Sequence, residues 1–203
     1  MIGFMSIASS PLSIAVSFGP FGVHHVNSSW VAIQKLREMG VVDGNVHLVI
    51  QRLPVEYDAV RKLVPELWEK HNPTLMVHTG VSGAATELVV EKLAHNDGYC
   101  SRDVCGLFPS TQCCVEEGAT VLETELDVEK VCRCLNEVEC KVVAVPSMDA
   151  GRYLCDFCYY TSLNINRRAT VFIHVPPLDK PYSASQMALG LRVLITALLE
   201  QVS

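Results

Sequence analysis

The stretch Ser147–Tyr160, which reads SMDAGRYLCDFCYY, decides the fold of this chain. The apolar run Val142–Pro146 leads into it and predicts a β-strand. The sequence Asp149-Ala150-Gly151 is typical of a turn, and the aromatic-rich residues after it predict a helix from Ala150 to about Asn164. A strand that passes through a short turn into a helix is the building unit of an α/β protein.

The rest of the chain alternates in the same way, so the sequence predicts an α/β fold built around a largely parallel sheet. The other predicted strands are Ser13–Ser17, Val46–Leu53, Leu75–Thr79, Glu87–Ala94 and Thr170–Val175. The other predicted helices run from Ser28 or Ser29 to Met39, from Tyr57 to His71, over a short segment from Asp127, and from a capping box at Ser183–Gln186 to Gln201. His95–Thr120 is expected to be a loop.

Composition narrows the classes of function. With 203 residues and 49% hydrophobic residues, the chain is expected to form a single domain over residues 1–203, with residues 1–12 poorly ordered. The net charge of -6 and the lack of a basic cluster argue against a nucleic-acid partner. The apolar runs are too short for a membrane span, and the first basic residue is Lys35, which argues against a signal peptide. We therefore expect a soluble, cytoplasmic protein.

The 9 cysteines all lie between Cys100 and Cys158. An odd number of cysteines in a domain with ample core is unlike a secreted disulfide framework, so reduced thiols are expected. A zinc site is disfavoured because structural zinc sites use repeated, closely spaced cysteine pairs. Cys155 and Cys158 match the C-x-x-C redox pattern, but the pair lies late in the chain with no Trp or Pro beside it.

Cys155 allows two interpretations. A cysteine in an apolar helix is most often a small core residue. At the beginning of a helix, however, unpaired backbone N–H groups and the helix dipole favour the thiolate, which is a nucleophile. His174 ends an apolar strand before two prolines, where a parallel sheet presents residues to a ligand crevice. Glu91 ends the stretch VVE and is either an exposed strand end or a group that orients an imidazole.

Three segments together resemble one known family. SMDAGRYLC around Cys155, GVSGAATELVVEKLAHN around Glu91 and FIHVP around His174 are similar to the pyroglutamyl-peptidase I family of cysteine peptidases. The segments FGPFG (Phe18–Gly22) and PVEYDAV (Pro54–Val60) fit as well, and the resemblance extends over nearly the whole chain. It is strongest to the animal members or their pyroglutamyl-peptidase I-like paralogue.

The resemblance implies a three-layer α/β/α sandwich of the phosphorylase/hydrolase-like type and a Cys–His–Glu triad. Cys155 would be the nucleophile, His174 the general base and acid, and Glu91 the orienting acid. The reaction would remove pyroglutamate (5-oxoproline) from the N-terminus of short peptides through a thioester, without a metal or cofactor. Phe18 and Phe21 are the expected substrate-binding residues, as aromatic walls for the lactam ring; each could equally be a core residue.

Two departures from the family pattern favour an alternative. Where the family usually has Thr-Gly before the first Phe, this chain has Val16-Ser17, and where it has Ser or Thr two residues before the acid, this chain has Val89. Ser17 is expected to narrow the pocket or shift the loop, and Val89 to remove a hydroxyl that supports Glu91. The alternative is a catalytically weak or inactive paralogue that binds peptides or proteins. A thiol redox or zinc-binding protein is the remaining class.

Overall fold

The computed structural model describes residues 11–20, 26–41 and 46–202. A mixed sheet lies at its centre, with strand order β2-β1-β3-β8-β4-β7. Neighbouring strands pair in parallel except β4 and β8, which are antiparallel. The strands are β1 (Leu12–Phe18), β2 (His47–Leu53), β3 (Leu75–Val81), β4 (Leu88–Glu91), β7 (Ala144–Ser147) and β8 (Thr170–Val175). A separate small ribbon pairs β5 (Leu93–His95) with β6 (Val121–Glu123).

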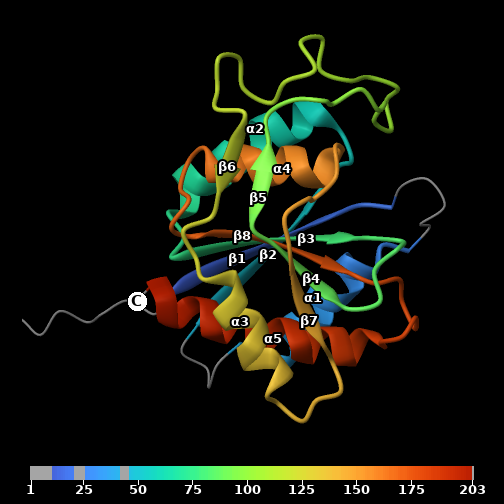
Figure 1. Cartoon of the computed structure of the whole chain (residues 1–203), viewed down its shortest axis with the longest axis vertical. Helices are drawn as coiled ribbons and strands as arrows, with labels where there is room; N and C mark the ends of the chain where they lie inside the picture. The colour runs from blue at the N-terminus through green and yellow to red at the C-terminus, as the bar shows by residue number, and fades with distance from the viewer. Residues whose placement is uncertain (1–10, 21–25, 42–45, 203) are drawn as a thin grey trace, which may run out of the picture.

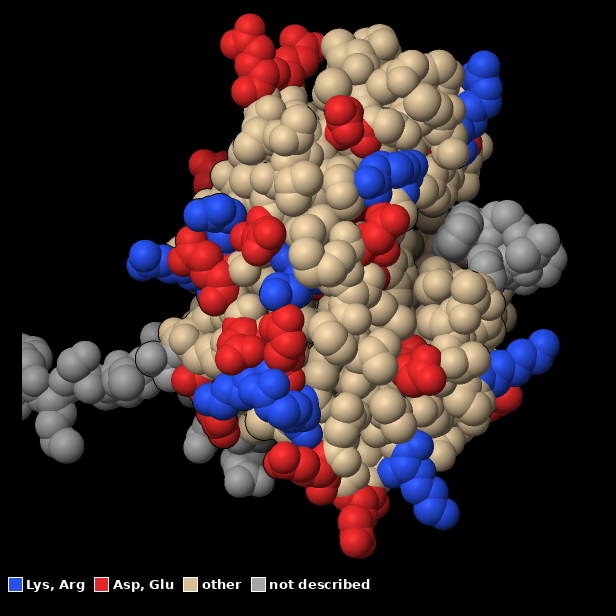
Figure 2. All heavy atoms as spheres, in the orientation of Figure 1, with Lys and Arg blue, Asp and Glu red and all other residues tan. Residues whose placement is uncertain are grey.

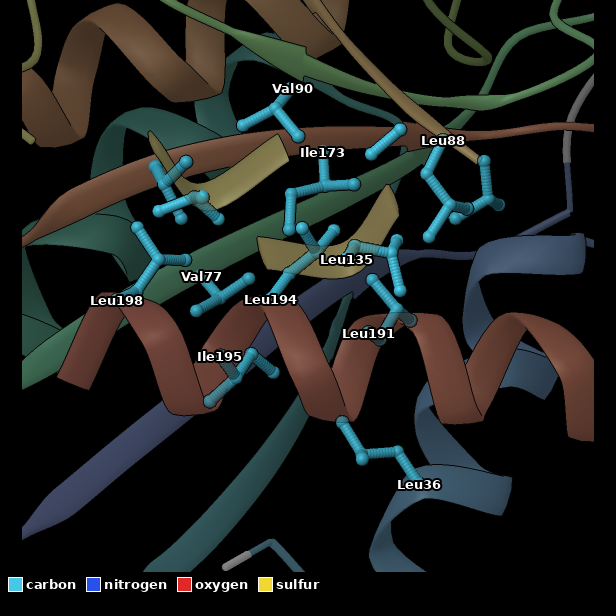
Figure 3. Packing of buried hydrophobic residues seen from close by; sticks show 14 of the residues in the cluster. Leu36, Val77, Leu88, Val90, Leu135, Ile173, Leu191, Leu194, Ile195 and Leu198 are labelled. Atoms are coloured by element: carbon cyan, nitrogen blue, oxygen red, sulfur yellow. The ribbon is translucent and has the colours of Figure 1, made fainter. Parts of the chain in front are cut away.

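Helices cover both faces of the sheet, which confirms the predicted α/β/α sandwich (Figure 1). One layer holds α2 (Tyr57–His71) and α4 (Leu154–Leu163); the other holds α1 (Ser28–Met39), α3 (Val128–Asn136) and α5 (Ala184–Val202). Each layer buries its own hydrophobic cluster against the sheet. Figure 3 shows the cluster between the sheet and the layer of α1, α3 and α5, in which Leu191, Leu194 and Leu198 of α5 point toward the strands. This apolar stripe has the helical spacing that the sequence displays.

The structure confirms two of the three helix caps that the sequence predicts. The Asp127 side chain accepts a hydrogen bond from the Lys130 N–H and begins α3. The Ser183 hydroxyl and the Gln186 side chain each bond the other residue's backbone N–H, which confirms the capping box of α5. The prediction for α1 was wrong by one residue, because the side chain of Asn27 accepts from the Ser29 N–H and caps the helix.

Two predicted elements differ from the structure near Cys155 and Glu91. Glu87–Ala94, predicted as one strand, is divided: β4 ends in the main sheet at Glu91, and the chain then enters the small ribbon as β5. The helix predicted from Ala150 begins only at Leu154. Gly151 has a φ of 87°, in the left-handed region, and its N–H bonds the Asp149 side chain, so a turn occupies the residues before the helix.

At the N-terminus, Leu12 already belongs to β1, so the expected disorder does not extend to it. Residues 1–10 lie outside the described part of the chain. Among the described residues, no helix combines the length and apolarity needed to cross a membrane.

Candidate active site

Cys155, His174 and Glu91 come from three different elements and meet at one place. Cys155 is the second residue of α4, His174 is the penultimate residue of β8, and Glu91 ends β4. All three line one cleft of about 380 Å³. The cleft lies beyond the carboxyl ends of β3 and β8, where ligands bind in open α/β sheets.

The imidazole and the carboxylate are tied together by strand pairing. In the antiparallel ladder of β4 and β8, Val89 faces His174 and Glu91 faces Phe172. Because alternate residues of a strand share a face, His174 and Glu91 project to the same side of the sheet. The Nδ1 atom of His174 lies 2.8 Å from Oε1 of Glu91, and both side chains are buried. The other ring nitrogen, Nε2, is therefore the atom that can contact the Cys155 sulfur.

The electrostatics of His174 favour its protonated form. Burial is the largest single influence on the pKa of His174 and lowers it, whereas the neighbouring Cys155 sulfur raises it through its charge and a hydrogen bond. Glu91 adds a smaller contribution in the same direction, and together they raise the pKa of His174 from 6.5 to about 10. At neutral pH the ring is therefore an imidazolium between a sulfur and a carboxylate. Such a ring can donate a proton to a leaving group, and the neutral ring that remains can then take a proton from water.

The beginning of α4 supplies backbone donors beside the sulfur. Tyr153 is the N-cap residue, and its side chain makes no capping hydrogen bond to the backbone. The first backbone N–H groups of a helix have no partner within the helix. The late start at Leu154 places Cys155 among these N–H groups, closer to the helix end than the sequence predicted. They can stabilise the oxyanion that forms when a thiolate attacks a carbonyl.

Phe18 borders a second, smaller cavity next to Cys155, and His174 does not line this cavity. Phe18 is the last residue of β1, is 2% exposed, and lines the cavity together with Cys155. The other residues of this cavity are Asn27, Val55, Gly80, Val81, Tyr153 and Leu154. Phe18 therefore borders this cavity and is at the same time part of the buried core, so its role as a substrate-binding wall stays a prediction. Phe21, the second expected wall, lies outside the described residues.

Two residues at the site were not recognised from the sequence. Gly80 is the penultimate residue of the buried strand β3, and a Cβ there would lie 2.7 Å from the Cys155 sulfur. The position therefore needs a residue without a side chain. Asn27 was passed over because its role as a cap was assigned to its neighbours; its amide also donates to the Gly19 carbonyl at 3.0 Å. The GVSG sequence at residues 80–83, inside a segment that carries the family resemblance, was the available signal for Gly80.

The two departures from the family pattern have different structural consequences. The Ser17 hydroxyl is buried and lies 2.7 Å from the Ser29 hydroxyl, and Ser17 does not line the cavity beside Cys155. The expectation that it narrows the pocket is wrong for the described residues. Val89 does line the cleft, on the same face as Glu91. Oε2 of Glu91 is buried and has no hydrogen-bond partner among the described residues, as expected where a hydroxyl is replaced by a methyl group.

The remaining candidates do not form a metal site. Among the described residues, no group of three or more His, Cys, Asp and Glu side chains is arranged to hold a metal ion. All 9 cysteines are free thiols. A larger cavity, of about 620 Å³, is lined by residues of α3 and α5 and the end of α1, and none of the residues discussed above lines it.

Comparison with known proteins identifies the family. A family model described as pyroglutamyl peptidase matches residues 13–194. Pyroglutamyl-peptidase 1 of Rattus norvegicus is 48% identical over 92% of this chain and 88% of its own length, and that of Homo sapiens is 47% identical over 92% and 89%. The human pyroglutamyl-peptidase 1-like protein is 38% identical over 77% of this chain and 79% of its own.

Solved structures agree on the fold. Pyroglutamyl peptidase I from Bacillus amyloliquefaciens superposes with a TM-score of 0.81 at 19% identity, covering 94% of this chain and 97% of the other. A mutant pyrrolidone carboxyl peptidase from Pyrococcus furiosus gives 0.82 at 20% identity, covering 95% and 100%. The family match over most of the chain, together with the high identity to the animal proteins, shows that this chain belongs to the pyroglutamyl peptidase family.

Proposed function

We propose that this chain is a cysteine exopeptidase that removes an N-terminal pyroglutamyl residue from short peptides. The observation that carries the proposal is the contact between Cys155, His174 and Glu91 inside one cleft. The relatives named pyroglutamyl-peptidase 1 support the substrate class, since they are more similar to this chain than the 1-like protein is.

The proposed reaction has two steps. The Cys155 thiolate attacks the carbonyl carbon of pyroglutamate, and N–H groups at the start of α4 hold the oxyanion. His174 donates its proton to the leaving amine, and a thioester of pyroglutamate remains on Cys155. Neutral His174 then takes a proton from water, which attacks the thioester and releases 5-oxoproline. Glu91 fixes the ring orientation throughout through its bond to Nδ1.

The two hollows beside Cys155 suit the two halves of the substrate. The small cavity behind Phe18 is mostly apolar, which suits a lactam ring that has no charged amine to bind. Its free volume is about 10 Å³, so the ring enters only if the cavity walls move apart. The larger cleft contains His174, where the leaving amine must be protonated, and it is open to the rest of the peptide. Phe18 is therefore our candidate for the substrate-binding wall, with Phe21 retained from the sequence pattern.

The protein is proposed to work as one domain in the cytoplasm, without nucleic-acid or membrane partners. Free thiols at all 9 cysteines suit a reducing compartment. The net charge is -6, and on the face drawn in Figure 2 the basic side chains are dispersed among acidic ones. A duplex-binding protein would gather its basic groups into a patch.

The test uses a fluorogenic amide of pyroglutamate with reductant present. Wild-type protein is expected to release the fluorophore, Cys155→Ala to release none, and Cys158→Ala to remain active. Turnover by wild type no greater than that of Cys155→Ala, at high protein concentration, would reject the peptidase and favour a binding paralogue. Equal inactivation by Cys155→Ala and Cys158→Ala would instead indicate a paired-thiol reaction.

A further inference from the structure

A second thiol lies one helical turn behind Cys155 on the same helix. Cys158 is the fifth residue of α4, three positions after Cys155. Helical geometry places the Cα atoms of residues three apart at about 5 Å. Disulfide bonds join residues whose Cα atoms are roughly 4.4–6.8 Å apart. The backbone spacing of this pair is therefore within the range of a disulfide, which the peptidase reaction does not need.

The two thiols differ in their access to solvent. Cys155 borders the cleft, whereas Cys158 is fully buried. Burial raises the pKa of the Cys158 thiol well above its ordinary value, and the neighbouring Cys155 charge adds to this. A dissolved oxidant therefore reaches Cys155 first, while Cys158 stays an unreacted thiol. An accessible thiolate with a second thiol close to it is the usual arrangement of a redox-sensitive cysteine and its resolving partner.

Cys158 is held by a partner outside the reaction. Its sulfur lies 3.2 Å from Nδ1 of His78, a fully buried residue of β3. Burial lowers the pKa of His78 from 6.5 to about 3, so the ring is neutral at physiological pH. Nε2 of the same ring has no hydrogen-bond partner among the described residues. The ring and the thiol thus form a second Cys–His contact, which no step of the peptide hydrolysis uses.

The position of Cys155 at the start of α4 also allows a disulfide bond to form between Cys155 and Cys158. In a regular helix the Cβ atoms at this spacing are about 5–6 Å apart, and a disulfide needs about 3.8 Å. The first helical turn must therefore tighten. Because the N–H of Cys155 belongs to the first turn, it donates no hydrogen bond within the helix that would resist this movement. The C-x-x-C sequence at a helix start is the arrangement in which thioredoxin-like proteins close the same ring.

We propose that Cys155 and Cys158 form a modification site for peroxides, at which an oxidised Cys155 is captured as a reversible disulfide. The Cys155 thiolate attacks one oxygen of hydrogen peroxide, and with one proton the O–O bond breaks to give Cys155 sulfenic acid and water. The Cys158 sulfur then attacks the Cys155 sulfur. The S–O bond breaks, the S–H proton leaves with the oxygen as a second water, and the S–S bond remains. An added dithiol restores both thiols.

The test follows the pair directly, apart from any peptidase activity. Arg152 and Arg167 flank a tryptic peptide, 153–167, that contains both cysteines and no others. Wild-type protein is treated with hydrogen peroxide, alkylated, digested and analysed by mass spectrometry. The expected product is this peptide with two hydrogen atoms fewer, unalkylated at both positions and returned to the dithiol form by dithiothreitol. The same samples, assayed with the fluorogenic amide, should lose activity with peroxide and regain it with dithiothreitol.

Variants separate the proposed pair from other thiols. Cys158→Ser should accumulate the sulfinic or sulfonic acid of Cys155, which dithiothreitol does not reverse. Cys132→Ala, which changes a buried cysteine of α3, should behave like wild type. Cys114→Ala should also behave like wild type, although Cys114 influences the pKa of Cys158.

Three results would overturn the proposal. The first is direct oxidation of wild-type Cys155 to the sulfinic acid with no intrapeptide disulfide. The second is a disulfide between Cys155 and a different cysteine, and the third is equal reversibility in Cys158→Ser. A protein without peptidase activity that still forms the disulfide would support this proposal and reject the proposed function, so the two outcomes are distinguishable.

Discussion

Replacing Gly80 by Ala should displace the Cys155 sulfur with little other change to the fold. An added Cβ would lie 2.7 Å from Sγ of Cys155 and 2.9 Å from Cζ of Phe172. Ordinary contact begins at 3.4 Å, so the sulfur must move by about 0.7 Å. Gly80 does not need a positive φ, so the backbone accepts Ala and the effect comes from these two contacts alone.

The two contacts predict two separate losses. The Cys155 sulfur can rotate away, which costs little stability but moves it from the His174 ring. A displacement approaching 1 Å in a reacting group costs up to about 10²-fold in rate, so kcat/KM should fall between about 10-fold and 10²-fold. The Phe172 ring is fully buried and has less room to move. Overpacking of this kind costs about 1–3 kcal/mol, so the free energy of unfolding should fall by that amount.

Gly83→Ala is the matched control, since it lies in the same segment and a Cβ there meets nothing within 4 Å. Turnover of the fluorogenic pyroglutamyl amide gives kcat/KM, and urea unfolding followed by fluorescence gives stability. Gly83→Ala should match wild type in both. If Gly80→Ala also matched wild type, the placement of Cys155 against β3 would be wrong. If it lost stability alone, Gly80 would matter for packing and not for the position of the sulfur.

Three further substitutions test the site. Glu91→Gln should lower kcat on the order of 10²–10⁴-fold. It should also shift the alkaline limit of kcat/KM to lower pH, because Glu91 contributes to the raised pKa of His174. An unshifted pH profile would contradict this. In wild type, the stability contributed by protonated His174 is complete below pH 6.5 and is lost as the pH rises through about 10, which urea unfolding against pH should show. Val89→Thr should place a hydroxyl donor next to Oε2 of Glu91, which has no partner among the described residues. The free energy of unfolding should rise by about 1 kcal/mol and kcat several-fold. Val89→Ala, which adds no hydroxyl, should raise neither quantity. Ser17→Ala should cost about 1 kcal/mol through loss of the bond to Ser29 and leave KM unchanged; a changed KM would return Ser17 to the substrate pocket.

The sequence predicted the helices and strands correctly where the hydrophobic pattern is long and where a capping residue marks the end of the element. The capping box at Ser183 and the cap at Asp127 are local signals, and both are confirmed. The division of Glu87–Ala94 between two sheets could not be read in this way. The segment contains no Gly or Pro that would mark a break, and only the pairing of β4 with β8 and of β5 with β6 separates the two parts.

The candidate site shows the same limit. Helix-start and strand-end arguments could single out Cys155 and His174 separately, but Glu91 needed the family resemblance. An antiparallel strand beside β8 brings its carboxylate within 2.8 Å of the ring, and no periodicity specifies that neighbour. Gly80 could not be recognised either. Its importance depends on the distance to a sulfur from another element, which exists only after folding.

The most direct measurement of the central claim is the covalent intermediate. Wild-type protein is mixed with a pyroglutamyl ester, quenched in acid within the first turnover, digested and analysed by mass spectrometry. We predict a pyroglutamyl group on Cys155 in peptide 153–167, no such adduct in Cys155→Ala, and longer-lived adduct in Glu91→Gln. Steady turnover without an adduct on Cys155, or with the acyl group on another cysteine, would contradict the assignment of this thiol as the nucleophile.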